Sequence, residues 1–168
     1  TLYTHRFESD FYDLAFFADG HGIVTGADWA QIGGWQGSVL KFDGNGSWYP
    51  AKLYEEEDFW PLSLEAPTAD KVYVGGFMDS THWSDGPAKL LRSEDGTNFY
   101  EASVPDSVQR IYDLHATSAM GVWAAGTTYT STLNEGSGGG AVLLHTTDGG
   151  ETWTSQDMGR APLGLRQL

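Results

Sequence analysis

The stretch Thr146-Thr147-Asp148-Gly149-Gly150-Glu151-Thr152-Trp153 decides how this sequence is interpreted. It follows the apolar run AVLLH at 141–145 and combines hydroxyls, a carboxylate and two glycines within five residues. Short polar side chains bond the backbone N–H groups of tight turns, and glycine permits the positive φ values that such turns need. The stretch therefore predicts a tight acidic turn between two β-strands.

Two earlier stretches are similar to this turn. SEDGTNF (93–99) is a shortened copy that ends in Phe instead of Trp, and DGNGSW (43–48) keeps the Asp and the Trp but has Asn where the glycine belongs. Internal repeats with a period of 20–50 residues indicate stacked or circular arrays of one structural unit. The aspartates of the three turns follow one another at steps of 52 and 53 residues and are Asp43, Asp95 and Asp148.

A second motif repeats with nearly the same spacing. In each copy an apolar strand leads through a polar turn into a β-rich stretch that ends at a glycine. The copies are FYDLAFFADGHGIVTGA (11–27), FWPLSLEAPTADKVYVGGF (59–77) and IYDLHATSAMGVWAAGT (111–127). The glycines lie two steps of 50 apart and are Gly26, Gly76 and Gly126. Together with the strands on either side of the acidic turn, each repeat contains four short strands, and no stretch has sustained helical periodicity.

Four short strands in a repeat of roughly 40 to 50 residues are typical of a β-propeller blade. We therefore expect an all-β fold in which the whole chain, 1–168, is a single propeller segment. Its three blades are expected at about 11–54, 58–104 and 109–158.

The two ends of the chain each resemble one strand of a further blade. TLYTHRF (1–7) is similar to the last strand of a repeat, such as TWTSQDM, and PLGLRQL (162–168) is similar to a first strand, such as IYDLHAT. Propellers usually have about four to eight blades, so three blades do not close a ring. We expect the ring to be completed either by the remainder of a longer chain or by further copies in a homo-oligomer.

The three turns also give the chain a resemblance to a known family. The third turn matches the Asp-box or BNR pattern, S/T-x-D-x-G-x-T-W, at every defined position. The chain resembles the Asp-box β-propeller repeat family, which includes sialidases, xyloglucan-type glucanases, sortilin-type receptor domains and photosystem II assembly-factor-like proteins. The resemblance implies that the box residues are structural, because they staple the turn and pack an aromatic ring between blades. They are Asp43, Trp48, Ser93, Asp95, Phe99, Thr146, Asp148, Gly150, Thr152 and Trp153.

In a propeller, two kinds of loop share one face, and function usually resides in loops carried by a rigid scaffold. The loops between second and third strands are predicted at 28–37, 78–87 and 128–140, and those between blades at 55–59 and 105–110. Exposed aromatic rings beside carboxylates suit stacking on sugars or on cationic side chains, although some of these tryptophans could instead cover the outer rim of the blades. The candidate ligand-binding residues are Trp29, Trp35, His82, Trp83, Tyr129, Asp28, Asp79 and Asp85.

The composition argues against several partners and cofactors. Nine Lys and Arg residues stand against 23 Asp and Glu, and the resulting net charge of −14 repels nucleic-acid phosphates and anionic membranes. There is no cysteine, so disulfide and thiolate chemistry are excluded, and no apolar run is long enough for a membrane helix. The acidic run at 55–58 offers oxygen ligands for Ca²⁺, but its spacing matches no known calcium loop, and no other cofactor is expected.

No catalytic site of the enzymes in this family can be assigned to residues of this chain. The arginines are scattered along the sequence and are not grouped as in a sialidase. A glucanase of the xyloglucan type uses two aspartates, which Asp28, Asp79 and Asp85 could supply, but their spacing does not favour any particular pair. We predict a non-catalytic propeller, extracellular or periplasmic, that recognises a glycan or a protein through its loops. The alternatives are part of an Asp-box glycoside hydrolase and a purely structural propeller in a surface assembly.

Overall fold

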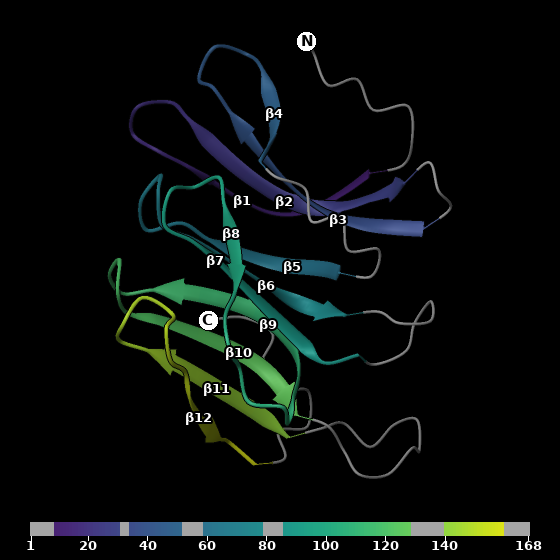
Figure 1. Ribbon diagram of the computed structural model, residues 1–168, viewed down its shortest axis with the longest axis vertical. Helices are drawn as coiled ribbons and strands as arrows, with labels where there is room; N and C mark the ends of the chain where they lie inside the picture. Colours follow the sequence, from purple (N-terminus) through teal and green to yellow (C-terminus); the bar gives the residue numbers. More distant parts are fainter. Residues whose placement is uncertain (1–8, 31–33, 52–58, 79–85, 129–139, 160–168) are drawn as a thin grey trace.

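In the computed structural model, three four-stranded antiparallel sheets are formed, and the described residues contain no helix (Figure 1). The structure describes residues 9–30, 34–51, 59–78, 86–128 and 140–159. The first sheet contains β1 (Ser9–Phe16), β2 (Gly22–Ala30), β3 (Gly34–Phe42) and β4 (Trp48–Ala51). The second contains β5 (Phe59–Glu65), β6 (Val72–Met78), β7 (Ala88–Ser93) and β8 (Phe99–Glu101). The third contains β9 (Val108–Ala116), β10 (Val122–Thr128), β11 (Ala141–Thr146) and β12 (Thr154–Asp157).

Each sheet is a meander in which consecutive strands are hydrogen-bonded neighbours. The predicted all-β class and the three four-stranded units are therefore confirmed. The three acidic turns each join the third strand of a sheet to its fourth, since β3 ends at Phe42, β7 at Ser93 and β11 at Thr146. In the view of Figure 1, the first sheet lies at the top, the second in the middle and the third at the bottom.

Some predicted loops are shorter than expected. The loop predicted at 28–37 is wrong over most of its length, because β2 continues to Ala30, β3 starts at Gly34, and Trp29 is the Cα partner of Trp35 across the hairpin. Tryptophan favours strands, so the hairpin extends into a stretch that its polar and glycine residues had marked as a loop. Likewise, β9 begins at Val108, inside the loop predicted at 105–110.

The first strand of each sheet contains a β-bulge at the same position of the repeat. The pairing register shifts between Phe11 and Asp13 in β1 and between Pro61 and Ser63 in β5, and the same shift occurs in β9, where Ile111 precedes it. A bulge adds one residue to one strand and bends it locally. Phe11, Pro61 and Ile111 follow one another at steps of 50, so the repeat seen in the sequence is also a repeat of backbone geometry.

The repeated glycines lie opposite these bulges. A Cβ atom on Gly26, Gly76 or Gly126 would lie 2.1, 2.0 or 2.2 Å from a carbonyl oxygen of the neighbouring first strand. No side chain fits at such a distance, so a close approach of two backbones fixes glycine at all three positions. The bulged pairing of the first two strands therefore explains why each repeat has a glycine at this position.

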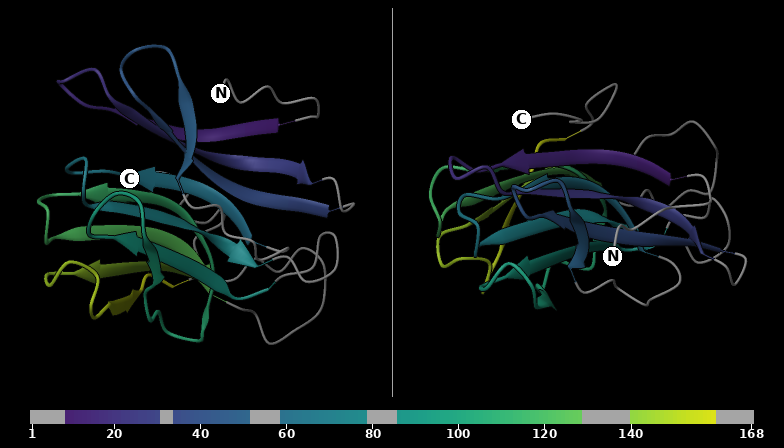
Figure 2. Two further views of the ribbon diagram at one scale, coloured as in Figure 1. Left: turned by 45° about the horizontal axis from the view of Figure 1, so that its top comes forward. Right: turned by 90° about the horizontal axis from the view of Figure 1, so that it is seen from above.

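Neighbouring sheets pack face to face, and their contacts centre on the first strands (Figure 2). Two clusters of buried side chains fill the interfaces. The cluster between the first and second sheets contains Ile23, Val39, Phe59, Leu64, Val72, Val74 and Leu91. The cluster between the second and third sheets contains Tyr73, Ala88, Leu90, Ala102, Val108, Ile111, Leu114, Val122, Ala124, Val142, Leu144 and Trp153. A polar contact also links the first strands of the first and second sheets, because the Leu64 N–H donates to Oδ2 of Asp13 at 2.8 Å.

Candidate binding site at the ends of the first strands

The ligand residues predicted from the sequence fall into two groups. Asp28 and Trp29 lie near the end of β2, and Trp35 lies near the start of β3, so the first sheet brings these three residues to the same end. Outside the described residues lie Asp79, His82, Trp83, Asp85 and Tyr129. Of the predicted ligand-binding residues, the structure therefore describes only the three in the first sheet.

Three further residues occupy this end of the sheets, each directly before the bulge of a first strand. They are Asp10 on β1, Trp60 on β5 and Arg110 on β9, at steps of 50 residues. The three residues have equivalent backbone positions, since the carbonyl of each one faces one of the repeated glycines. Their side chains differ, because they are a carboxylate, an indole and a guanidinium. A position whose backbone is fixed and whose chemistry differs in every sheet is suited to present different groups to a ligand.

Aromatic rings connect the three sheets at this level. The ring centroids of Tyr12 and Trp60 are 6.5 Å apart with planes tilted by 40°, and Trp60 stacks on Phe77 of β6 at 6.5 Å and 28°. The guanidinium carbon of Arg110 lies 4.3 Å from the centroid of the Phe77 ring. These separations are within the ranges of favourable aromatic pairs and cation–π contacts. We call Tyr12, Trp60, Phe77 and Arg110 the aromatic row.

The residues of the aromatic row differ in how far they are exposed to solvent. Phe77 is only 8% exposed, Trp60 and Arg110 are half-buried, and Tyr12 is 38% exposed. Partial burial raises the pKa of Tyr12, and the charge of the nearby Asp10 carboxylate raises it further. The phenol is therefore protonated at neutral pH and can both donate and accept hydrogen bonds. The aromatic row thus combines ring faces with a hydroxyl and a guanidinium.

A buried cation lies at the same end of the second sheet. The Lys89 side chain on β7 is 5% exposed, and its Nζ lies 3.4 Å from a carboxylate oxygen of Glu101 and 6.0 Å from the ring centroid of Phe59. Buried charges are stable when they are paired, so this lysine has a structural role in the packing of β7 near β5. The guanidinium of Arg110, which is half-buried, lies over the Phe77 ring of the aromatic row.

At the opposite end of the sheets, the acidic turns are held by their own side chains. Oδ1 of Asp148 accepts hydrogen bonds from the Thr152 N–H at 3.0 Å and from the Thr146 hydroxyl at 2.7 Å. Oδ2 of Asp148 accepts from the Thr152 hydroxyl at 2.6 Å, and the Thr146 hydroxyl oxygen accepts from the Gly150 N–H at 2.9 Å. The carboxylate therefore closes the turn from both sides.

The other two turns use the same device. Asp95 accepts from the N–H groups of Thr97 at 2.8 Å and Asn98 at 2.7 Å, and Asp43 accepts from the Ser47 N–H at 3.0 Å. Hydrogen bonds to the charged form favour it, so they lower the pKa of all three turn aspartates. These carboxylates are engaged with their own turns, which supports a structural role.

The aromatic residues of the turns are placed unequally. Trp153 is 8% exposed within the cluster between the second and third sheets, and Phe99 packs against the cluster between the first and second. Trp48, at the same position of the first sheet, is half-buried and lies 5.1 Å from the Phe42 ring and 6.4 Å from the Phe16 ring. The first sheet has no preceding sheet in the described structure for Trp48 to contact.

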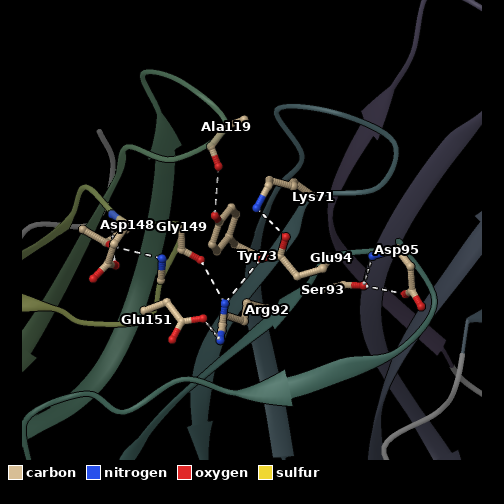
Figure 3. Close-up of polar contacts among 12 residues, drawn as sticks. Lys71, Tyr73, Arg92, Ser93, Glu94, Asp95, Ala119, Asp148, Gly149 and Glu151 are labelled. Carbon is tan, nitrogen blue, oxygen red and sulfur yellow. Dashed lines mark hydrogen bonds and ion pairs between the residues drawn. The ribbon is translucent and has the colours of Figure 1, made fainter.

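Polar contacts at the turn end join neighbouring sheets (Figure 3). Arg92 on β7 donates to a carboxylate oxygen of Glu151 at 2.8 Å and to the carbonyl of Gly149 at 3.4 Å, both in the third turn. The Tyr73 hydroxyl donates to the Ala119 carbonyl at 3.2 Å, which again connects the second sheet to the third. The turn end is therefore used by contacts within the protein, and the aromatic row at the other end is the better candidate for a ligand.

The sequence pattern placed Tyr12, Trp60 and Phe77 in strands and Arg110 at the end of a predicted loop, and it indicated none of the four as a ligand-binding residue. Tyr12 and Trp60 belong to apolar runs that were needed for the fold, and Arg110 stood at the edge of a predicted loop. A comparison of equivalent positions was the signal that could have found them, because Asp10, Trp60 and Arg110 differ in chemistry at a fixed step of 50.

Within the described ranges, no group of three or more His, Asp or Glu side chains is arranged to hold a metal ion, and no helix is long and apolar enough to cross a membrane. The proposed calcium ligands at 55–58 lie outside the described residues. No protein-family model matches this chain, and no curated protein matches its sequence.

Proposed function

We propose that this chain is part of an Asp-box β-propeller that binds carbohydrate at the ends of its inner strands, without catalysing a reaction on it. The observation that carries the proposal is the aromatic row, in which three rings and a guanidinium from three sheets meet at the end opposite the acidic turns. Aromatic side chains with a small number of placed polar groups are the typical lining of small-ligand sites.

The propeller architecture is supported by the way in which the sheets repeat. All three sheets have the same strand order, and β1, β5 and β9 carry the contacts between sheets, as the innermost strands of blades do. The hydrogen bonds of Asp43, Asp95 and Asp148 within their turns support the assignment of those turns as Asp-boxes. Both features are independent of any ligand.

The chemistry of the aromatic row favours a sugar over the other ligand classes. The C–H face of a pyranose packs on a flat ring, while its hydroxyls need donors and acceptors at the rim, which Tyr12, Asp10 and Arg110 provide. The net charge of −14 disfavours polyanionic ligands, so we propose a neutral glycan. Trp29 and Trp35, whose backbone positions lie at the same end of the first sheet, remain candidate ligand residues in the proposal.

A matched pair of tyrosine variants tests the proposal. Tyr12 is 38% exposed in the aromatic row, and Tyr100 is 58% exposed on β8, so alanine is tolerated by the fold at both positions. An aromatic contact contributes about 0.5–1.5 kcal/mol, so Tyr12→Ala should weaken oligosaccharide binding about two- to tenfold. Tyr100→Ala should bind as the parent protein does.

The measurement is an array of neutral and acidic oligosaccharides, followed by calorimetric titration of the best ligand. Retained affinity in Tyr12→Ala would contradict the site, and an array without any bound oligosaccharide would contradict carbohydrate recognition. Cleavage of a bound glucan during the titration would replace the binding function with the hydrolase alternative.

A further inference from the structure

The outer edges of the second and third sheets differ at one repeated position. Ala88 is the first residue of β7 and Ala141 is the first residue of β11, and the two are equivalent in the strand register. In the third sheet, the segment that follows β12 pairs with both backbone groups of this alanine. The Ala141 N–H donates to the Gly159 carbonyl at 3.0 Å, and the Ala141 carbonyl accepts from the Met158 N–H at 2.9 Å.

The second sheet leaves the same two groups without a strand partner. The Met78 N–H donates to the Pro87 carbonyl at 2.9 Å, so the backbone groups of Pro87 face β6 and those of Ala88 face the outer side of β7. The outer strand pairs with β7 only as far as the bond from the Ala102 N–H to the Leu90 carbonyl at 2.8 Å. Beyond that bond, no described residue is hydrogen-bonded to the N–H or the C=O of Ala88.

The chain leaves β7 at this point because it crosses to the third sheet. Val104 packs against the cluster between the second and third sheets, and Pro105, which has no N–H, begins the turn into β9 by accepting from the Val108 N–H at 2.9 Å. A cavity of about 430 Å³ lies next to Ala88 where the outer strand would otherwise continue. We call it the β7 notch, and its lining residues are Pro87, Ala88, 101–106 and Val108.

The two unpaired backbone groups of Ala88 specify the kind of ligand that fits the β7 notch. In a trans amide the N–H and the C=O point in opposite directions, so a single amide, such as the acetamido group of a sugar, cannot bond both groups. A residue of an extended peptide directs its own N–H and C=O to the same side, as paired strand residues do. A peptide main chain is therefore the ligand that matches Ala88.

The side chains that line the β7 notch favour a basic peptide. Its two carboxylates belong to Glu101 and Asp106. The Glu101 carboxylate lies 3.4 Å from Lys89 Nζ, whereas Asp106 is exposed and has no ion-pair partner among the described residues. The net charge of −14 adds to the attraction for a cationic partner.

We propose that the β7 notch binds an extended segment of another protein that carries a basic side chain and continues β8 along β7. Met158 and Gly159 form the corresponding pairing in the third sheet, and addition of a peptide strand to an open sheet edge is a common mode of recognition. The inference is independent of carbohydrate binding. The oligosaccharide array tests Tyr12 and the peptide titration below tests Ala88, so the two proposals can fail separately.

Two equivalent amides, those of Ala88 and Ala141, provide the test. In the free chain, hydrogen exchange should be slow at the paired Ala141 amide and fast at the Ala88 amide. The probe is acetyl-Met-Gly-Arg-amide, which has the sequence of residues 158–160. Titrated to about 10 mM, a range that detects millimolar affinity, it should shift the ¹H–¹⁵N resonance of Ala88 and slow its exchange. The Ala141 amide should be unaffected.

Altered peptides and a matched pair of variants separate main-chain pairing from other contacts. N-methylation of the methionine removes the donor to the Ala88 carbonyl and should weaken binding about tenfold. Acetyl-Met-Gly-Glu-amide should bind more weakly than the arginine peptide. Ser103→Tyr should fill the β7 notch and abolish binding, whereas Ser155→Tyr, on the exposed face of β12, should bind as the parent chain does.

Several results would overturn the inference. An Ala88 amide that is already protected in the free chain would show that the chain itself occupies the β7 notch. An unshifted Ala88 resonance at the highest peptide concentration, or equal affinity for the N-methylated peptide, would exclude strand pairing. Equal affinity for the arginine and glutamate peptides would exclude a basic partner. If circular dichroism shows that Ser103→Tyr is unfolded, Asp106→Lys replaces it and should remove the preference for the arginine peptide.

Discussion

Asp148 holds its turn with both carboxylate oxygens: Oδ1 accepts from the Thr152 N–H and the Thr146 hydroxyl, and Oδ2 accepts from the Thr152 hydroxyl. Charge-assisted hydrogen bonds of this kind are roughly twice as strong as neutral ones. Because the acceptor is most effective when it is ionised, the geometry of the turn is coupled to the charge of a single residue. The same coupling applies to Asp43 and Asp95.

The acid dependence of stability follows from this coupling. The pKa values of the three turn aspartates are lowered in the folded chain, whereas the unfolded carboxyl titrates near its usual value of about 3.9. Their contribution to stability is therefore complete above that value and is lost as the pH falls toward the folded pKa. We expect the melting temperature to be nearly constant from about pH 7 to 5 and to fall below about pH 4.

Thermal melts of a double variant check this expectation. Asp95→Asn combined with Asp148→Asn should lower the melting temperature at neutral pH and should flatten its decline in acid, because two of the titrating groups are gone. Asp106→Asn removes a charge from an exposed position before β9 and serves as the control. An acid profile of the double variant that matches the parental profile would show that other groups govern the acid dependence.

The turn residues could be predicted from the sequence because all their contacts lie within a few residues of one another. The aromatic row could not, because its members come from four strands in three sheets, and Tyr12 and Trp60 are far apart in the chain. Alternation of apolar residues marks a strand and its buried face, but it does not indicate which strand ends meet. The meeting of Tyr12, Trp60 and Arg110 depends on how successive sheets stack.

At the level of the strands, the repeated bulge explains features that the sequence showed without a cause. The glycines at steps of 50 marked the period of the repeat, and the structure relates each one to a carbonyl of the neighbouring first strand. The hairpin of β2 and β3 shows where the sequence pattern fails. Glycine-rich segments around Trp29 and Trp35 indicated a loop, whereas strand pairing continues there. Local composition places turns, whereas the length of a hairpin depends on the pairing of both strands.

Replacement of a bulge glycine should therefore be unusually costly. A Cβ on Gly76 would lie 2.0 Å from the Trp60 carbonyl oxygen and 2.9 Å from the Pro61 Cα, so β5 must move. We expect Gly76→Ala to lower the free energy of unfolding by about 3 kcal/mol, at the upper end of overpacking effects. Gly46→Ala is the matched control, since its Cβ meets nothing within 4 Å and its φ of +100° alone costs about 1–2 kcal/mol. Urea unfolding measures both, and equal losses would contradict the close approach.

At the level of the whole molecule, one interface is used repeatedly. The step from the first sheet to the second and from the second to the third buries equivalent apolar faces, and the turn aromatics Phe99 and Trp153 pack into successive clusters. The three sheets could be predicted because each repeat carries its own turn and glycine signals. The difference in exposure between Leu14 and Leu64 could not be predicted, since both are leucines in similar apolar runs and differ only in what packs against them.

The aromatic row exists only because the sheets stack in this order, so ligand binding at Trp60 tests the account most directly. The chain has seven tryptophans, and each indole N–H gives one resonance in a two-dimensional ¹H–¹⁵N spectrum. Titration with the oligosaccharide that binds best on the array should shift the indole resonance of Trp60. It should leave that of Trp153 in place, because Trp153 is 8% exposed in the cluster between the second and third sheets. Shifts confined to other tryptophans, with Trp60 unmoved, would contradict the account.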